Sequence, residues 1–416
     1  MPQHRPPRSR PTEAEAIGER VRDARLRLGL TQADLAAELR RTQSWLSKVE
    51  RGHQELDRTS VINELAAALH VHPNDLIERP YPAAADGVAW QRSASAIMRE
   101  LRRYDLTPVF DGTPRPAAGL WRDMAKLHKL RDNAASTKIL ASLPDLLREA
   151  RALAEAGTGR EREESFAIYA IACKFAHTAA HALGHPELIA MACERAAWAS
   201  RLSGDELLPA VADWMRVWDM WATADWDDSL ALSDKALRHV EPHYRRGDPA
   251  AVRLWGSLHL RAAVSAARAG RDRGAEARHR IEQAGEAAER LPRMGFDRHS
   301  LTFSPGNVRI HAVNIALELT QHDEALRLHQ RMPASMVTAL PRSRRGHYRL
   351  DVARAYLWTG DRDRALTELE EAERTAPQLI RNHPIARATL RRIRSAERAG
   401  VRERLRLMSA RFHLDE

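Results

Sequence analysis

The sequence predicts an all-α protein in two parts: a small N-terminal domain of short helices, followed by a long stack of helical hairpins. Three observations support this fold class. Apolar residues recur at helical spacing through most of the chain, and β-branched and aromatic residues never alternate over the length of a strand. A hairpin-like unit also recurs at 40 to 50 residues in the second part. With 416 residues and 44% hydrophobic content, the chain can form two or three domains with substantial cores.

Composition narrows the possible classes of protein. No apolar run approaches the roughly 20 residues of a membrane span, and no signal-like apolar region follows the start. Two cysteines, Cys173 and Cys193, are too few for a disulfide framework. We therefore expect a cytoplasmic protein with no membrane partner.

The net charge of the whole chain is +10, yet residues 1–80 hold 13 Arg and Lys against 12 Asp and Glu. Any prediction that this first part binds DNA must therefore rest on a sequence motif and not on a large positive charge.

The elements follow in a simple order along the chain. Residues 1–12 are basic and proline-rich and predict a disordered tail. Residues 13–78 predict a helical domain, residues 79–95 carry the turn residues of a linker, and residues 96–416 predict the helical repeats. Within the first domain, helical patterns cover residues 17–28, 32–39, 43–50, 61–69 and 73–77.

A motif within the first domain places polar side chains on the outer face of a short helix. Thr31 and Thr42 are good N-cap residues in front of two helical runs, and Gly52 ends the second run. The apolar faces consist of Leu35, Ala36, Leu39, Leu46 and Val49. Outward-facing Gln is suited to adenine and Lys to guanine. The motif therefore predicts two helices joined by a tight turn, with the second helix facing a DNA major groove.

This stretch, TQADLAAELRRTQSWLSKVERG, resembles the helix-turn-helix of lambda-repressor-like transcription regulators. The resemblance covers residues 17–77. It rests on Thr31-Gln32, Leu35-Ala36, Ser47, Glu50 and Gly52. Arg40-Arg41 departs from the Gly-Val that the family prefers, so a positive φ at the turn is expected to cost some strain. The resemblance also implies that Arg25 and Glu50 form a structural ion pair.

The same resemblance implies which side chains meet DNA. Gln32 is expected at a phosphate, and Gln43, Ser44 and Lys48 at base edges. Trp45 replaces a small residue, and two placements are open: against a sugar or thymine methyl group, or flat on the next helix. The predicted DNA-binding residues are Gln32, Arg41, Thr42, Gln43, Ser44, Trp45, Ser47, Lys48 and Arg51.

The clearest unit of the second part is HYRLDVARAYLWTGDRDRALTELEEAERTAP, residues 347–377. It resembles a tetratricopeptide repeat, a pair of antiparallel helices, at Tyr356, Gly360, Ala365, Ala372 and Pro377. Weaker copies share its frame, and the predicted turn positions are Gly184, Ala224, Gly270, Thr320 and Gly360. Their spacings of 40, 46, 50 and 40 residues exceed the family norm of about 34, so helices or loops are longer. Stacked hairpins of this kind form a curved solenoid with a concave face.

In that family the first helix of each pair lines the concave groove. Carried onto this chain, the frame also places Lys174, Thr178, His181, Glu318 and Trp358 there. Asn side chains can pair with a peptide backbone, as they do in similar peptide-sensing regulators, and a Trp cluster offers flat apolar area. Core packing for the Trp residues, and solvent or capping for the Asn residues, remain open. The predicted ligand-binding residues are Trp214, Trp218, Trp221, Asn307, Asn314 and Arg354.

Other chemistry finds little support in the sequence. Cys173, His177, His181 and His185 recur every four residues, but each step turns the helix by about 40°, so the four cannot all face one ion. No Gly-rich phosphate loop, H-E-x-x-H or nucleophile elbow is present. We expect no metal, no cofactor and no enzymatic activity.

These features predict a sequence-specific transcription regulator that binds double-stranded DNA. One such domain makes few base contacts, so a homodimer on two half-sites is expected. The repeat domain is predicted to sense a peptide or a small molecule. The alternative is a protein-interaction scaffold built on the repeats, with a weak or degenerate DNA-binding domain. The nearly neutral first domain and Arg40-Arg41 favour this alternative.

Overall fold

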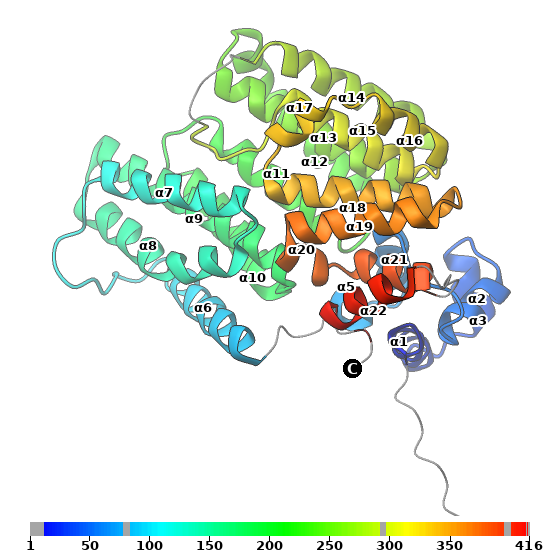
Figure 1. Cartoon of the computed structure of the whole chain (residues 1–416). Coiled ribbons are helices and arrows are strands. Elements are labelled where there is room, and N and C mark those ends of the chain that lie inside the picture. The colour runs from blue at the N-terminus through cyan, green and yellow to red at the C-terminus, as the bar shows by residue number, and fades with distance from the viewer. Residues whose placement is uncertain (1–11, 78–83, 292–296, 395–400, 413, 415–416) are drawn as a thin grey trace, which may run out of the picture.

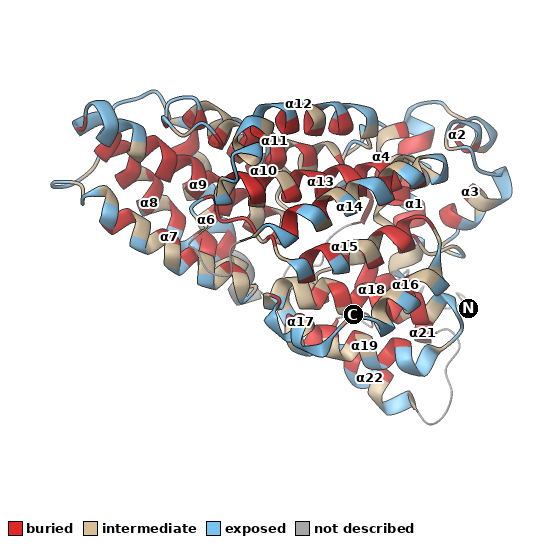
Figure 2. Cartoon of the chain, turned by 90° about the horizontal axis from the view of Figure 1, so that it is seen from above, coloured by how far each residue is buried: buried red, intermediate tan, exposed pale blue. Residues whose placement is uncertain are grey.

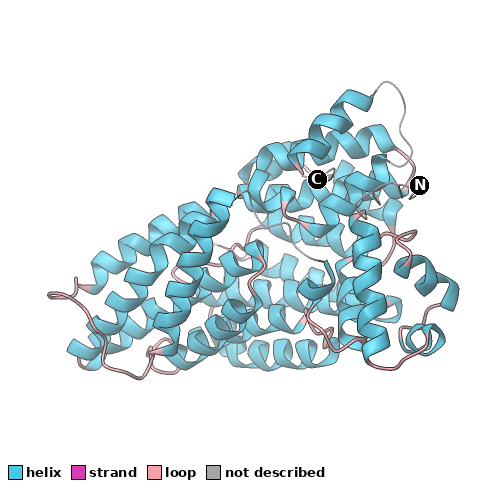
Figure 3. Cartoon of the chain, turned by 90° about the horizontal axis from the view of Figure 1, so that it is seen from below, coloured by secondary structure: helices cyan, strands magenta, loops and turns pink. Residues whose placement is uncertain are grey.

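The computed structural model describes residues 12–77, 84–291, 297–394, 401–412 and 414. These residues form 22 α-helices and one short 3-10 helix, with no strand among them (Figure 3). The predicted all-α class is confirmed. None of the described helices combines the length and the hydropathy that a membrane span requires. The predicted tail lies outside the described residues, except for Thr12.

Five short helices form the N-terminal domain. They are α1 (Glu13–Arg27), α2 (Gln32–Glu38), α3 (Gln43–Glu50), α4 (Thr59–Ala68) and α5 (Pro73–Ile77). All five were predicted, but α1 begins four residues before the predicted start. Thr12 and Glu15 form a capping box, in which each side chain accepts a hydrogen bond from the backbone N–H of the other. This reciprocal cap fixes the first turn of α1.

The remaining helices build the second part of the chain. They are α6 (Ala84–Arg102), α7 (Ala117–Asp132), α8 (Ser136–Ala156), α9 (Gly159–Leu183), α10 (Pro186–Ser200), α11 (Leu208–Met220), α12 (Trp226–Arg245), α13 (Pro249–Ala269), η1 (Arg271–Arg273), α14 (Gly274–Glu289), α15 (Pro305–Glu318), α16 (His322–Gln330), α17 (Ala334–Ala339), α18 (Arg342–Trp358), α19 (Arg362–Thr375), α20 (Pro377–Arg381), α21 (Pro384–Arg394) and α22 (Arg402–Arg411). Successive helices pack against each other along the chain, as in a solenoid.

Each of the five predicted turn positions joins the two helices of a hairpin. Their backbone φ angles are positive: 74° at Gly184, 58° at Ala224, 149° at Gly270, 60° at Thr320 and 92° at Gly360. A positive φ takes the chain out of the right-handed helix and reverses it. The sequence frame is therefore confirmed at these turns. A sixth turn, at residue 134 between α7 and α8, has a φ of 57° and was not predicted.

Helix α6 corrects the predicted linker. It begins at Ala84, so residues 84–95 are helical and not the irregular linker that their composition suggested. Trp90, Ala94, Ile97 and Leu101 are buried in the core of the repeats. Their spacing is that of one helical face, and this apolar stripe outweighs the loop-like composition around it.

The stack curves back on itself. In Figure 1 it runs from α6 to α10 on the left, across α11 to α16 at the top, and returns through α18 and α19. Helix α21 thereby lies beside the start of α1, where Arg387 contacts Glu13. Figure 2 shows the buried residues gathered on the facing sides of the helices. Ile385 of α21 belongs to the same apolar cluster as the core of the N-terminal domain. The N-terminal domain therefore completes its core with a residue of the C-terminal helices.

Candidate DNA-reading face and interior cavity

The second helix of the motif, α3, has one buried face and one exposed face. The Thr42 side chain accepts a hydrogen bond at 3.1 Å from the backbone N–H three residues later and so caps the helix. Leu46 and Val49 are fully buried, whereas Gln43 and Lys48 are exposed. In Figure 1, α2 and α3 lie at the outer edge of the molecule. The exposed face of α3 is therefore accessible to a DNA major groove.

Most of the predicted DNA-binding side chains are on this exposed face. The exposed ones are Arg41, Thr42, Gln43, Ser44, Lys48 and Arg51, and the half-buried ones are Gln32, Trp45 and Ser47. Arg51 donates from Nε to the carbonyl of Ser47 at 3.1 Å. The exposed side chains of Gln43, Ser44 and Lys48 form no hydrogen bond or ion pair with other described residues, so their polar atoms are accessible from outside.

Gln32 instead forms a hydrogen bond with a buried ion pair, that of Arg25 and Glu50. Arg25 Nε lies 2.6 Å from Glu50 Oε1, and its Nη2 lies 3.1 Å from Oε2. Gln32 Nε2 donates to the same carboxylate at 2.7 Å. The Glu50 hydrogen bond raises the pKa of Arg25. The predicted ion pair is confirmed, while the Gln32 amide that was expected at a phosphate supplies a third donor to the buried carboxylate.

The turn between α2 and α3 has the positive φ expected of it. Arg40 adopts a φ of 52°, a conformation that a residue with a Cβ adopts only at some cost. The Arg41 guanidinium carbon lies 5.5 Å from the centroid of the Trp45 ring. Trp45 is half-buried and packs against the core of its own domain.

Ion pairs fix the N-terminal domain to α21. Arg391 contacts Glu55 through Nε at 2.8 Å and Glu13 through Nη1 at 2.7 Å. Arg387 contacts the same Glu13 oxygen at 2.7 Å. The Arg387 and Arg391 side chains are only 6% and 14% exposed, so these pairs are better shielded from solvent than ordinary surface pairs.

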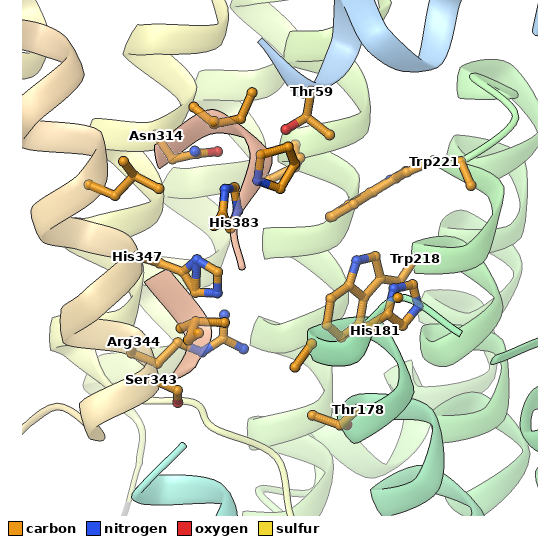
Figure 4. Close-up of a pocket in the computed structure, with 18 of the residues that line it drawn as sticks. Thr59, Thr178, His181, Trp218, Trp221, Asn314, Ser343, Arg344, His347 and His383 are labelled. Carbon is orange, nitrogen blue, oxygen red and sulfur yellow. The ribbon is translucent and has the colours of Figure 1, made fainter. Parts of the chain in front are cut away.

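A cavity of about 400 Å³ lies between the docked domain and the repeats (Figure 4). The first helices of five hairpins, α9, α11, α13, α15 and α18, contribute much of its wall. From the N-terminal domain, Thr59, Ile62 and Asn63 of α4 line it together with residues of α5. Asn63 Nδ2 donates to the carbonyl of Trp221 across this boundary. A molecule in the cavity would therefore lie against both parts of the chain.

The three predicted tryptophans all line the cavity. Trp218 stacks on His181 with ring centroids 3.9 Å apart. Trp214 and Trp221 are only 7% and 8% exposed, and Trp221 Nε1 donates to the Ser265 hydroxyl at 2.8 Å. Core packing and a place on the ligand-facing surface were the two alternatives for these tryptophans. The three side chains pack within the protein and also form part of the cavity wall.

Two other predicted ligand residues line the cavity but have partners within the protein. Asn314 Nδ2 donates to Asp351 Oδ2 at 3.0 Å. Arg354 Nη1 donates to the other oxygen of Asp351 at 3.1 Å, and Arg354 Nη2 donates to the Asp57 carbonyl at 3.1 Å. Arg354 therefore connects α18 to the N-terminal domain.

The expectation that Asn307 faces a groove is wrong. Asn307 is 3% exposed and is not part of the cavity lining. Its position in the first turn of α15 directs it to the preceding loop, where Nδ2 donates to the Thr302 carbonyl. Trp358 also lies outside the lining and stacks on His322 with centroids 5.4 Å apart.

The sequence frame missed several cations of the cavity. Arg131 lies three residues before the turn at 134, the same offset as His181 before Gly184, so recognition of that turn would have found it. Arg344 in α18 and Arg261 in α13 also line the cavity, although the repeat frame placed neither of them on the groove. No sequence signal indicated that α4 would close the cavity.

The Cys–His series does not gather into one group. Cys173 is fully buried, His177 and His181 contact each other with centroids 4.5 Å apart, and His185 caps α10. In the described part of the chain, no three His, Cys, Asp or Glu side chains are placed to hold a metal ion.

Comparisons with known proteins bear mainly on the N-terminal domain. A search of curated proteins found no match to this chain. Among solved structures, the apo form of the competence regulator ComR from Streptococcus vestibularis is similar at 9% identity, over 96% of this chain and 99% of that chain, with a TM-score of 0.29. PlcR from Bacillus thuringiensis, solved with the peptide PapR7 and DNA, is similar at 16% identity over 66% and 95% of the chains, with a TM-score of 0.25.

ComR from Streptococcus suis is similar at 15% identity over 91% and 94% of the chains, with a TM-score of 0.21. Identities and TM-scores this low transfer no ligand or partner to this chain. The sequence profile of the family described as "Helix-turn-helix domain" matches residues 16–79, a range that includes most of α1 and all of α2 to α5. The N-terminal part of this chain is a helix-turn-helix domain.

Proposed function

We propose that this protein is a cytoplasmic transcription regulator that reads a specific DNA sequence and is controlled by a ligand in its interior cavity. The observation that carries the proposal is the shared wall of that cavity. The helix-turn-helix domain exposes the polar face of α3 on one side and contributes α4 residues to the cavity on the other.

Gln43, Ser44 and Lys48 are the proposed base-reading residues. They are exposed, and Gln and Lys present donors that match adenine and guanine in the major groove. Arg41 and Arg51 flank them and would contact phosphates. Since one domain reads only a few base pairs, we propose that the protein binds as a homodimer to two half-sites about one helical turn apart.

Control by a ligand follows from the contacts at the cavity. Thr59, Ile62 and Asn63 belong to the DNA-binding domain, and Trp218 and Arg344 to the repeats. A ligand that binds more tightly to one arrangement of these two parts shifts the population toward that arrangement. In a dimer, such a shift would change the spacing of the two recognition helices and thereby the affinity for paired half-sites.

The test is selection of bound duplexes from a random DNA pool, using the full-length chain and the variant Gln43→Ala/Lys48→Ala. We expect enrichment of an inverted repeat with the native chain and its loss with the variant, since each paired base contact contributes about 1–3 kcal/mol of discrimination. Glu38→Ala, an exposed change at the end of α2, is the matched control and should retain the enrichment.

Binding without enrichment, unchanged in the variant, would contradict the base-reading assignment. That result would favour the alternative of a protein-interaction scaffold, for which the nearly neutral charge of residues 1–80 is the supporting observation.

A further inference from the structure

The cavity wall carries more positive than negative charge. Six cationic side chains line it: Arg131, Lys174, Arg261, Arg268, Arg344 and Arg354. Three acidic side chains line it: Asp219, Glu318 and Asp351. Glu318 pairs with Arg268 at 3.4 Å, and Asp351 with Arg354. Two of the three acids are therefore already committed to two of the cations.

The four other cations lie near one another. Burial and the charges of Arg344 and Arg268 lower the pKa of Arg261. Burial, followed by the charge of Arg131, lowers the pKa of Arg344 to about 10. Burial lowers the pKa of Lys174 well below its usual value, and Arg131, Arg261 and Arg344 all act in the same direction. These four side chains, Arg131, Lys174, Arg261 and Arg344, form what we call the cation cluster.

Among the described residues, two carboxylates offset part of this charge: Asp297 raises the pKa of Lys174 and Asp132 raises that of Arg344, but burial and the neighbouring cations lower both pKa values overall. Arg131 pairs with Asp132 at 2.9 Å, and Lys174 Nζ donates to the carbonyl of Ser300 at 2.7 Å. Neither Arg261 nor Arg344 forms an ion pair with a described carboxylate. Buried positive charge without a counter-charge is costly, and the cost falls when an anion enters.

Arg261 is held in place by aromatic rings. It is 8% exposed, and its guanidinium carbon lies 4.1 Å, 4.4 Å and 4.9 Å from the ring centroids of Trp214, Trp218 and Trp221. The negative faces of aromatic rings attract a cation but leave its formal charge in place. The guanidinium is therefore fixed at the cavity wall and still lacks an anion.

The opposite walls differ in character. Figure 4 shows Arg344 and His347 of α18 facing the stacked pair of His181 and Trp218 across the cavity. Burial, with the charge of Arg344, lowers the pKa of His347 to about 4, so this ring is neutral at neutral pH. The α18 wall therefore offers charge and hydrogen-bond donors, and the facing wall offers the flat His181–Trp218 stack with the Arg261 guanidinium beside it.

We propose that the cavity binds an organic anion, with its acid group at the cation cluster and a flat apolar body against His181 and Trp218. This inference deepens the proposed function, because it rests on the cavity being the ligand site and names the class of ligand. The shared chemistry, a carboxylate on an apolar body, has two sources: a small aromatic acid, or the C-terminus of a short peptide.

The first test is calorimetric titration of the full-length chain, without DNA, with naphthaleneacetate and with its neutral analogue naphthaleneacetamide. We expect the acid to bind at least about tenfold more tightly, since hydrogen bonds to charged groups are the stronger ones. Arg344→Met should remove this preference and leave amide binding unchanged. Arg342→Met is the matched control: Arg342 lies in the same helix, is exposed and does not line the cavity.

A second measurement uses an anion without an apolar part, so it does not depend on which organic acid is chosen. At constant ionic strength, replacing chloride by inorganic phosphate should raise the unfolding temperature of the native chain by more than that of Arg344→Met, which retains only the general stabilising effect of phosphate. Equal affinity for acid and amide, or no binding of either together with an equal rise in phosphate for both chains, would overturn the proposal.

Two peptide pools distinguish the sources of the carboxylate. Short peptides with free C-termini should compete with naphthaleneacetate if the ligand is a peptide, whereas pools with amidated C-termini should not. Competition by neither pool assigns the site to small acids, and equal competition by both would contradict recognition of a carboxylate. None of these binding measurements contains DNA. If the chain binds the acid more tightly than the amide but enriches no DNA sequence, the proposed function is contradicted and this inference still holds.

Discussion

At the scale of single residues, the buried Arg25–Glu50 pair makes the DNA-binding domain sensitive to the loss of either partner. The side chains are 8% and 3% exposed, and Nε and Oε1 lie 2.6 Å apart. We expect Glu50→Leu to cost about 3–5 kcal/mol, because it leaves a buried cation without a partner. Hydrogen exchange of the α1 and α3 amides in the full-length chain measures this loss.

The double variant Arg25→Met/Glu50→Leu is the matched control for that change. It replaces both charges by apolar side chains of similar size, so most of the lost protection should return. If the double variant is as unprotected as Glu50→Leu, the lost packing of Glu50, and not the stranded charge, is responsible.

A second residue-scale prediction concerns acid lability. His259 is 5% exposed, neither of its ring nitrogens has a hydrogen-bond partner among the described residues, and burial lowers its pKa to about 3. Above pH about 6.5 the ring is neutral in both the folded and the unfolded chain. As the pH falls below that value, the unfolded chain takes up a proton that the folded chain does not. Stability therefore falls toward acid pH.

From pH 7.5 to pH 5, His259→Leu should lose about 1–2 kcal/mol less of unfolding free energy than the native chain. Urea unfolding at the two pH values measures the difference. His279→Leu, whose native side chain is 64% exposed, serves as the control and should lose as much as the native chain. The same loss in His259→Leu as in the native chain would show that His259 is not the responsible group.

At the scale of elements, the hairpin turns depend on left-handed backbone. Ala224 adopts a φ of 58° and Gly360 a φ of 92°, and a Cβ added at Gly360 would meet nothing within 4 Å. We expect Ala224→Gly to stabilise the chain and Gly360→Ala to destabilise it, each by about 1 kcal/mol, because only the backbone preference changes. Urea unfolding of the two variants measures both values.

Gly285→Ala is the control for that pair. Gly285 lies within α14, where a Cβ also meets nothing within 4 Å and no positive φ is required. Here Ala should stabilise by about 0.5–1 kcal/mol through helix propensity. If Gly285→Ala lowers the unfolding free energy, replacing glycine is destabilising in general. The effect of Gly360→Ala could then not be attributed to the positive φ of the turn.

At the scale of the whole molecule, the docking of the N-terminal domain depends on α21. Arg391 is 14% exposed and contacts both Glu13 and Glu55. Arg391→Ala should weaken docking by about 2 kcal/mol, less than for a fully buried pair because solvent reaches part of the site. Hydrogen exchange of α1 and α4 should then accelerate, while single half-site binding through α3 stays within about twofold.

Arg406→Ala is the control, since Arg406 pairs only with its helix neighbour Glu403 among the described residues and is 68% exposed. It should leave exchange in α1 and α4 unchanged. Unchanged exchange in Arg391→Ala would mean that apolar contacts such as Ile385 hold the domains without help from these ion pairs.

The local part of this architecture could be predicted from the sequence. Thr31 and Thr42 cap α2 and α3 as expected, and all five expected turn positions have a positive φ. Caps and turns depend on residues within four or five positions of one another, so the sequence pattern contains the information. The linker prediction for residues 84–95 failed because composition was weighed above the apolar spacing of Trp90, Ala94 and Ile97.

The candidate cavity could be predicted only in part. The repeat frame located Trp214, Trp218 and Arg354 on its wall, because groove positions recur at fixed offsets from each turn. It misplaced Asn307, whose side chain serves the loop before α15, and it missed Arg261 and Arg344. Offsets taken from a repeat family no longer identify the cavity-facing residues when one copy is shifted by a residue or one helix is a turn longer.

By itself, then, the sequence determined the helices, their caps, the turns and the exposed face of α3, because each follows from interactions within a few residues. Only the tertiary structure decided that α4 closes the cavity, that α21 holds the N-terminal domain, and that four cations meet inside. Those contacts join residues far apart in the chain, such as Asn63 with Trp221 and Glu13 with Arg391. They depend on the curvature that small rotations accumulate over many stacked hairpins.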